Sequence, residues 1–258
     1  MNPIHLAKLT PCLGLAVAFT LLSGCAVNQH TDDKNDPLEG FNRAMYGFNE
    51  TVDKALIKPL AVGYETAIPQ PARTGVGNFF NNLAYPIVII NSFLQGKFEQ
   101  GAEDLQRFIY NSTFGLAGLI DIATPMGLEA NNEDFGQTFG YWGFGRGYYL
   151  VLPFFGPSTV RDGIGLYVDA QFDLLQHHSD VAERNQLWAI KIIDRRARFL
   201  GAERVLEAAA LDPYVFTREA YLQRRDSLIR DGVAAPREED DDDDEEAFDP
   251  GAKHLIAP

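Results

Sequence analysis

Residues 140–162, GYWGFGRGYYLVLPFFGPSTVRD, constrain the fold more than any other segment of this chain. Up to Val160 they hold seven aromatic residues, five glycines and two prolines, with Arg146 as the one charged residue. Glycine is entropically costly in a helix and proline lacks the N–H that a helix interior needs, so the segment is a poor helix. It is also far too apolar for an ordinary solvated loop. We therefore expect it to face something other than bulk water or a conventional helical core.

The N-terminus has the pattern of an export signal followed by a lipid-attachment site. A mildly basic start precedes the apolar run Leu13–Leu22, which is too short to span a bilayer and has the length of a signal-peptide core. The small residues before Cys25 resemble the bacterial lipobox, in which a diacylglyceryl group is attached to the cysteine and the chain is cut before it. We predict a signal peptide over residues 1–24 and acylation of Cys25. The alternative is a simple secretory signal in which Cys25 is incidental.

Acylation decides how the protein meets the membrane. Each buried CH₂ contributes about 0.8 kcal/mol, and the several acyl chains of a bacterial lipoprotein make an effectively permanent anchor. Ala26 follows the cysteine, whereas an aspartate there would resemble the signal that retains lipoproteins at the inner membrane. We expect the protein to be lipid-anchored in the outer membrane and to face the periplasm. Cys12 lies inside the signal, so the mature chain has a single cysteine and no internal disulfide.

Composition divides the rest of the 258-residue chain into three parts. Residues 25–35 form a short polar tether, residues 36–232 a folded domain, and residues 233–258 a tail with nine consecutive acids at 238–246. A block of like charge repels itself, so we expect a disordered tail, with docking to a basic partner or loose cation binding as alternatives. These acids account for most of the formal charge of −14, and the chain lacks the basic footprint of nucleic-acid binding.

Apolar residues in the domain recur at helical spacing. The first predicted helix is capped by Asp36, has Pro37 at its first position, and carries an apolar stripe made of Leu38, Phe41, Met45, Phe48, Val52 and Leu56. Further helices are predicted at about residues 60–66, within 73–114, after a cap at Ser158, over 181–210, and from Asp212-Pro213 onward. The alternation of several strands is missing, and only residues 148–152 suit one short extended piece. The predicted fold class is all-α.

The apolar and aromatic segments have two interpretations. They form the core of a soluble α-helical domain, which is the usual reason for aromatics at helical spacing. Or they lie in a membrane interface, where aromatic rings sit at headgroup depth. The most apolar segment, residues 83–93, is too short to span a bilayer but suits a buried helix or one lying in the membrane plane. The predicted anchor favours the interface, because it holds these helices against a bilayer.

A search for an active site finds no catalytic set. The sequence has no G-x-S-x-G elbow, H-E-x-x-H pair or phosphate-binding G-x-x-x-x-G-K-[ST] loop. His177 and His178 are adjacent and so are badly spaced as two ligands of one metal on a helix. Glu133 and Asp134 are explained more simply by capping and solvation than as a catalytic pair. We predict no enzymatic activity, no metal site and no cofactor.

Six blocks of the sequence carry further information. In order they are DPLEGFNRAMYGFNETVDK, PQPARTGVGNFFNNLAYP, NSFLQGK, RFIYNSTFGLAGLIDIAT, EDFGQTFGYWGFGRGYYLVLPFFGPSTVRDGIG and DPYVFTREAYLQRR. Together these blocks resemble the MlaA (VacJ) lipoprotein family over about residues 36–230. The resemblance implies a ring of amphipathic helices that lies in the inner leaflet of the outer membrane, around a polar-lined central channel for phospholipid headgroups. The acidic tail lies outside the resemblance.

The resemblance also implies a function and partners. We expect the chain to remove phospholipids mislocalised to the outer leaflet of the outer membrane, which maintains the lipid asymmetry of that membrane. We expect it to sit beside a trimeric porin and to pass lipid to a soluble periplasmic carrier of the MlaC kind, without hydrolysing the lipid. Such a path must be wet for the charged headgroup, since burial of an unpaired phosphate is prohibitive, and apolar for the acyl chains.

Under this interpretation residues 140–155 are the mobile lip of the channel. We predict four hinges, Gly140, Gly143, Gly145 and Gly147, and six aromatic residues that face acyl chains or the interface, Tyr141, Trp142, Tyr148, Tyr149, Phe154 and Phe155. Deep packing of Tyr149 and Phe154 in a rigid protein core would contradict this role. By resemblance to the family's first-helix motif, Phe41 and Asn42 help to hold the channel in its resting state.

Three functions are open at this point: a phospholipid-transfer channel, a lipoprotein scaffold that only docks envelope partners, and a lipid-active hydrolase. The sequence has no recognisable pairing of a nucleophile with a base, which counts against the hydrolase. Transfer and scaffold differ in whether the helices leave a lipid-sized opening. A cavity lined on one side by asparagines and backbone groups, and open at the periplasmic end of the ring, would favour transfer.

Overall fold

The computed structural model describes residues 36–209 and 211–233. The predicted signal peptide, Cys25, the tether and nearly all of the acidic tail lie outside these residues. In chain order the elements are α2 (Glu39–Val52), the π-helix η3 (Asp53–Ile57), α3 (Lys58–Ala67), α4 (Gln70–Leu94), α5 (Phe98–Thr113), the 3₁₀ turn η4 (Thr124–Met126), α6 (Phe135–Tyr141), β1 (Tyr149–Leu152), β2 (Gly156–Thr159), α7 (Val160–Phe172), α8 (Val181–Ala209) and α9 (Pro213–Ile229). The all-α prediction is confirmed, and the predicted extended piece is one strand of an antiparallel hairpin.

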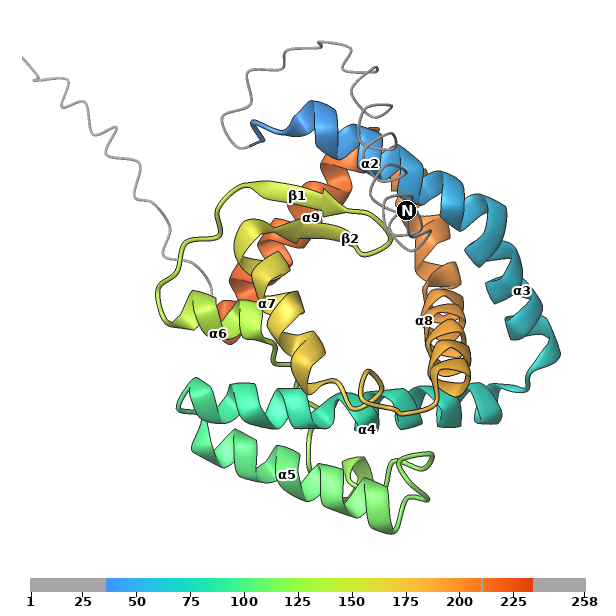
Figure 1. Cartoon of the computed structure of the whole chain (residues 1–258), viewed down its shortest axis with the longest axis vertical. Helices are drawn as coiled ribbons and strands as arrows, with labels where there is room; N and C mark the ends of the chain where they lie inside the picture. Colours follow the sequence, from blue (N-terminus) through green and yellow to red (C-terminus); the bar gives the residue numbers. More distant parts are fainter. Residues whose placement is uncertain (1–35, 210, 234–258) are drawn as a thin grey trace, which may run out of the picture.

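The elements are arranged as a ring (Figure 1). The arc of α2, η3 and α3 makes one side, α4 crosses one end, and α7 with the hairpin makes the opposite side. α8 packs against α3, α9 packs against α6 and β2, and α5 lies along α4. No described helix or strand runs through the middle of the ring in this view. The ring shape is therefore set by helices that contact their neighbours around its circumference.

The arc of α2, η3 and α3 is longer than the sequence predicted, because the helix at 60–66 is joined to the first one. Pro59 lies in the first turn of α3, directly after η3. Proline cannot donate the backbone hydrogen bond that a regular α-helix needs there, and the wider π-helical turn takes up the mismatch without a break. The chain leaves the helical conformation only at Ile68, where φ is −101° and ψ is 121°.

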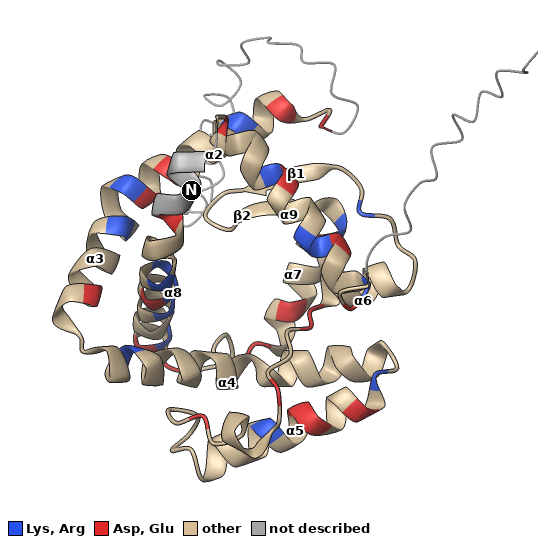
Figure 2. Ribbon diagram, turned by 180° about the vertical axis from the view of Figure 1, so that it is seen from behind, with Lys and Arg blue, Asp and Glu red and all other residues tan. Residues whose placement is uncertain are grey.

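Helix α4 is a single helix of 25 residues that contains Pro86 without ending there. Arg73 is its one charged residue, and its ribbon is otherwise uncoloured in Figure 2. Neither α4 nor any other helix within residues 36–209 and 211–233 combines the length and apolar character needed to cross a bilayer. The segment 83–93 is therefore part of a long helix within the ring.

Of the three predicted helix N-caps, one is confirmed and two are wrong. Asp212 caps α9 as predicted, because its side chain accepts hydrogen bonds from the backbone N–H groups of Tyr214 and Val215. The predicted cap at Ser158 is wrong by one residue, since the side chain of Thr159 accepts the capping bond. The prediction for Asp36 is also wrong: α2 begins at Glu39, and the Asp36 side chain is buried in contacts described below.

The interior of the described domain is unusually polar. Fourteen hydrophobic side chains are buried, against nineteen polar or charged ones. The larger apolar cluster lies between α2, the hairpin and α9 and consists of Met45, Tyr149, Val151, Tyr214 and Leu222. A smaller cluster joins α3 to α8 and consists of Ala61, Ala197 and Leu200. Each core is small for a domain of this length, so polar contacts must hold much of the ring together.

Most of the apolar stripe predicted on the first helix is exposed and not part of the core. Leu38, Phe41, Phe48 and Leu56 are all exposed, and Met45 is the buried member of the stripe. Large apolar side chains are exposed on every helix of the arc and on α5, α7 and the hairpin turn. Exposed apolar side chains in such number are typical of proteins that contact another protein or a membrane. A soluble-protein core therefore does not account for the stripe.

An ionic cluster closes the ring where α6, α7 and α9 meet, and Figure 2 shows the gathering of charges there. Arg225 donates to both carboxylate oxygens of Asp134, at 2.6 and 2.8 Å, and to Asp162 at 3.1 Å. The hydroxyl of Tyr221 also donates to Asp162, at 2.7 Å. Burial disfavours ionisation of Asp134 and Asp162, but Arg225 outweighs it and the pKa of each carboxyl lies below its ordinary value.

Asp169 of α7 lies beside this cluster without a cation of its own. One of its oxygens accepts a hydrogen bond from the backbone N of Phe135 at 3.2 Å. Burial, together with the negative charge of Asp134, raises the pKa of Asp169 to about 7. The folded protein therefore holds a proton on Asp169 that the unfolded chain releases at a pH near 4.

This difference predicts a pH-dependent stability. The contribution of Asp169 is fully present below pH 4 and is lost as pH rises through 7, because only the unfolded state ionises freely over that interval. Asp169→Asn removes the titrating group and keeps an acceptor for Phe135. We expect urea unfolding to show a smaller loss of stability between pH 5 and pH 8 in Asp169→Asn than in the wild type. Asp226→Asn, on α9 but outside these contacts, is the control, and equal profiles for all three proteins would contradict the assignment.

Candidate functional site

Asn42 joins α2 to the edge of the hairpin. Its Oδ1 accepts a hydrogen bond from the backbone N of Val151 at 2.9 Å, and its Nδ2 donates to the carbonyl oxygen of Tyr149 at 3.0 Å. Nδ2 also donates to the carboxylate of Asp36 at 2.9 Å, and the side chain has no exposed surface. The amide thus makes the two backbone contacts that a neighbouring strand would otherwise make.

Asn49 repeats this contact two turns further along α2. Its Nδ2 donates to the carbonyl oxygen of Leu152 at 2.9 Å, and its Oδ1 accepts from the backbone N of Phe154 at 2.7 Å. Residues seven apart share one face of a helix, so both asparagines lie along the same edge of β1. Phe154 has a φ of +66°, which is strained for a bulky residue, and its bond to Asn49 helps to hold that conformation.

Asp36 ties the start of the domain to the last helix. One carboxylate oxygen accepts from Asn42, and the other accepts from the hydroxyl of Tyr214 and from Nη1 of Arg218, the latter at 3.3 Å. All four side chains are buried. Burial and the bond to Asp36 raise the pKa of Tyr214, so its hydroxyl remains a donor to the carboxylate at physiological pH.

The aromatic residues predicted at the lip divide into two groups. Tyr141, Trp142, Tyr148, Phe154 and Phe155 are exposed, and Phe154 has the largest exposed fraction, 71%. The placement of Tyr149 differs from the prediction, because its side chain is only 2% exposed and packs in the larger apolar cluster. Side chains alternate along a strand, so Tyr149 and Val151 point inward together.

The four glycines of the segment also differ from one another. Gly143 and Gly147 have φ values of +89° and +67°, which side-chain-bearing residues rarely adopt. Gly145 has open space around its α-carbon. Gly140 belongs to α6, and a methyl group there would approach Ile229 within 2.7 Å, so close packing explains this glycine better than a hinge does. Hinge motion at the other three positions stays a prediction.

Phe41 and Asn42 are neighbours in sequence but point to different environments. Phe41 is 51% exposed, whereas Asn42 is buried against the hairpin and Asp36. The contacts of Asn42 give a physical reason for the resting-state role that the family resemblance implies. No such contact accounts for Phe41.

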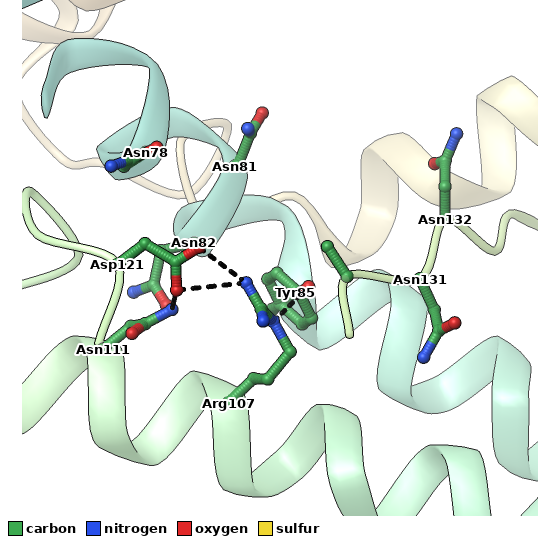
Figure 3. A pocket seen from close by; sticks show the side chains of 10 residues that line it. Asn78, Asn81, Asn82, Tyr85, Arg107, Asn111, Asp121, Asn131 and Asn132 are labelled. Atoms are coloured by element: carbon green, nitrogen blue, oxygen red, sulfur yellow. Dashed lines mark hydrogen bonds and ion pairs between the residues drawn. The ribbon is translucent and has the colours of Figure 1, made fainter. Parts of the chain in front are cut away.

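A polar pocket of about 360 Å³ lies between α4, α5 and the loop that follows α5 (Figure 3). Its wall is dominated by asparagine and contains Asn78, Asn81, Asn82, Tyr85, Arg107, Asn111, Asp121, Ala130, Asn131 and Asn132. Among the described residues, the side chains of Asn81 and Asn132 make no hydrogen bond with the protein, and both are exposed. These amides are therefore available to a ligand, and an asparagine-rich wall is one of the two features expected of a transfer cavity.

Arg107 and Asp121 form an ion pair in the pocket wall. Nη2 of Arg107 lies 3.1 Å from Asp121, Nε donates to the hydroxyl of Tyr85 at 2.8 Å, and Nη1 donates to Thr124 and to the carbonyl oxygen of Leu128. Burial disfavours ionisation of Asp121, but hydrogen bonds from Thr124 and Asn111 and the charge of Arg107 hold its pKa below the ordinary value. Both charges are thus satisfied within the protein.

None of the pocket residues was predicted as part of the site. The sequence signal was present, since Asn78, Asn81 and Asn82 are spaced to lie on one face of an otherwise apolar helix. The contribution of α5 and of residues 130–132 depends on how the loop folds back over α4, which sequence spacing does not indicate. Asn49 was likewise missed, although it lies seven residues after Asn42.

Comparisons with known proteins agree on one family. A family model described as MlaA lipoprotein matches residues 34–228. The "Intermembrane phospholipid transport system lipoprotein MlaA" of Shigella flexneri is 40% identical over 230 residues, which cover 87% of this chain and 90% of that protein. The protein of the same name from Haemophilus influenzae is 35% identical over 219 residues, covering 82% and 87%. A structure solved in work on the "Structural basis for maintenance of bacterial outer membrane lipid asymmetry" matches with a TM-score of 0.68 and 36% identity, covering 76% of this chain and 100% of the other.

The contacts of Asn49 predict a local effect on the hairpin turn. Asn49→Ala removes two hydrogen bonds, so we expect the free energy of unfolding to fall by about 1–2 kcal/mol and the amide of Phe154 to exchange faster with solvent. The amide of Val151, held by Asn42, should keep its protection. Hydrogen-exchange mass spectrometry tests this, with Thr51→Ala as the control because its hydroxyl bonds only within α2. Unchanged exchange at Phe154 would contradict the role of Asn49.

Proposed function

Because this chain belongs to the MlaA lipoprotein family, we propose that it transports phospholipids between the two membranes of a bacterial envelope. The family match covers most of the described domain, and the relatives named above are lipoproteins of an intermembrane phospholipid transport system. In this proposal the chain takes phospholipids that have reached the outer leaflet of the outer membrane back toward the periplasm. Its activity maintains the lipid asymmetry of the outer membrane.

The observation that best supports this proposal is the inverted distribution of polarity. The buried side chains of the described domain are mostly polar, while many large apolar side chains are exposed on its surface. A ring seated in a membrane places such a surface against acyl chains and keeps a hydrated path for headgroups. A soluble scaffold has no comparable reason to expose Phe41, Phe48 and Leu56 together.

The same exposed apolar side chains support a proposed position of the ring in the membrane. No described helix can span a bilayer, so we propose that the helices lie in the membrane plane with their apolar sides in the inner leaflet of the outer membrane. Exposed aromatic residues such as Trp142 and Tyr148 suit headgroup depth. Acylation at Cys25, which lies outside the described residues, anchors the chain on the periplasmic side.

The hairpin is the proposed moving part of the lip. Its turn exposes Phe154 and Phe155, and its edge is held by amides of α2 and not by a third strand. In the resting state Asn42 and Asn49 keep β1 against α2. A phospholipid that contacts the turn displaces the hydrogen bonds of Asn49, while those of Asn42 hold the base, and the aromatic side chains then line the route of the lipid.

Partners complete the proposed route. A trimeric porin beside the ring gives access to the outer leaflet, and a soluble carrier of the MlaC kind receives the lipid in the periplasm. The chain moves lipid without hydrolysing it. In the described residues the two histidines contact the carbonyl oxygen of Asp173 and the carboxylate of Glu183, and neither contact is with a hydroxyl or thiol nucleophile.

Lipid analysis of the outer leaflet tests the proposal. In cells that lack the protein we expect phospholipid to accumulate at the surface, and we expect wild-type protein but not Cys25→Ala to reverse the change. Immunoblots of membrane and soluble fractions control for expression of the variant. Unchanged surface lipid, together with loss of envelope complexes, would favour the scaffold function instead.

A further inference from the structure

We propose that the pocket between α4 and α5 binds the uncharged polyol part of a phospholipid headgroup, as in phosphatidylglycerol. This inference rests on the proposed transport function and names a substrate class for it. The pocket is separate from the hairpin lip, since α5 and the loop after it pack on α4 at the end of the ring away from β1 and β2 (Figure 1). It is a second place where the ring can hold a lipid.

The charges of the pocket exclude ionic headgroup chemistry. The guanidinium of Arg107 donates hydrogen bonds to Asp121, Tyr85, Thr124 and the carbonyl oxygen of Leu128. A phosphate therefore finds no free cation among the lining residues. The carboxylate of Asp121 accepts from Arg107, Asn111 and both the backbone N and the hydroxyl of Thr124. An ammonium group, as in phosphatidylethanolamine, therefore finds no free carboxylate in the wall.

Neutral hydrogen-bonding groups remain, and the pocket is rich in partners for them. A primary amide offers two donor hydrogens and an acceptor oxygen, which match adjacent hydroxyl groups. Asn81 and Asn132 make no side-chain hydrogen bond within the described domain. Asn82 donates to Ser112, and its Oδ1 is buried without a partner in the pocket wall. A volume of about 360 Å³ accommodates a short polyol with some water.

An apolar rim beside the pocket indicates that the polyol belongs to a lipid. The loop between α5 and Asp121 exposes Phe114, Leu116, Leu119 and Ile120. It is fixed on α4 at two points, where Asn78 donates to the carbonyl oxygen of Leu119 and where Gly118 packs against Asn82. A β-carbon at Gly118 would lie 2.5 Å from the β-carbon of Asn82, so only glycine allows this approach. The polar pocket and the apolar rim together suit a ligand that has both a polar and an apolar part.

The test compares two lipids on the full-length, acylated protein. Binding of phosphatidylglycerol and of phosphatidylethanolamine is measured by native mass spectrometry in detergent, with free glycerol as a competitor. The variant Asn81→Ala with Asn132→Ala removes amides that bond to nothing else in the described protein, so its fold should persist. Asn185→Ala, an exposed asparagine on α8, is the matched control.

We expect the double variant to weaken phosphatidylglycerol binding by about 10- to 30-fold, the loss of two neutral hydrogen bonds, with phosphatidylethanolamine unchanged. Equal effects on both lipids, or no effect, would overturn the polyol assignment while leaving transport intact. If free glycerol competes as strongly as the lipid, the pocket binds a free polyol, and the assignment to a lipid headgroup is overturned. Failure of the proposed function looks different, because the wild-type protein would then bind neither lipid and its deletion would not change the surface.

Discussion

The ring depends on one buried carboxylate. Asp36 precedes the first helix, yet it contacts Tyr214 and Arg218 of the last helix and Asn42, which holds the hairpin. The two carboxylate oxygens of Asp36 thus connect α2, the hairpin through Asn42, and α9, which are distant in sequence. Removal of one partner from such a buried ionic site typically costs about 3–5 kcal/mol, because the remaining charge is left uncompensated. The larger apolar cluster joins the same three elements through Met45, Val151 and Leu222, so closure of the ring here is both electrostatic and hydrophobic.

The same constraint recurs around the circumference. Arg225 joins α9 to α6 and α7, Arg107 joins α5 to α4 and the following loop, and Arg196 joins α8 to η3 through Asp53 at 2.7 Å. Buried polar groups must be paired, and pairing has directional geometry that packing of methyl groups lacks. Each arginine therefore fixes how two or three elements meet. Large apolar side chains are then free to be exposed, since the core does not need them.

The sequence predicted what depends on local chemistry. The all-α class, the start of α9 at Asp212 and one strand of the hairpin follow from capping, proline placement and side-chain pattern. It did not predict the role of Asp36. An acid before proline has the pattern of a helix N-cap whether or not it contacts a distant arginine in the fold. Tyr149 was misplaced for a related reason: within an aromatic run, only the pairing partner of a strand decides which ring points inward. The asparagine pocket needs two helices and a loop, which no single segment encodes.

The energetics of the hairpin explain why its turn, and not its base, is suited to move. At the base, Tyr149 and Val151 are buried, and such side chains contribute about 1.5–3 kcal/mol each. At the turn, Phe154 and Phe155 are exposed, and the backbone is held by two hydrogen bonds to Asn49 worth about 1 kcal/mol each. The positive φ of Phe154 costs about 1–3 kcal/mol of that stabilisation. Hydrogen bonds and strain nearly cancel at the turn, which leaves the edge-to-face contact between the Phe48 and Phe154 rings, at a centroid distance of 5.3 Å, to hold it. Contacts with an apolar ligand that replace this one therefore suffice to displace the turn while the base stays in place.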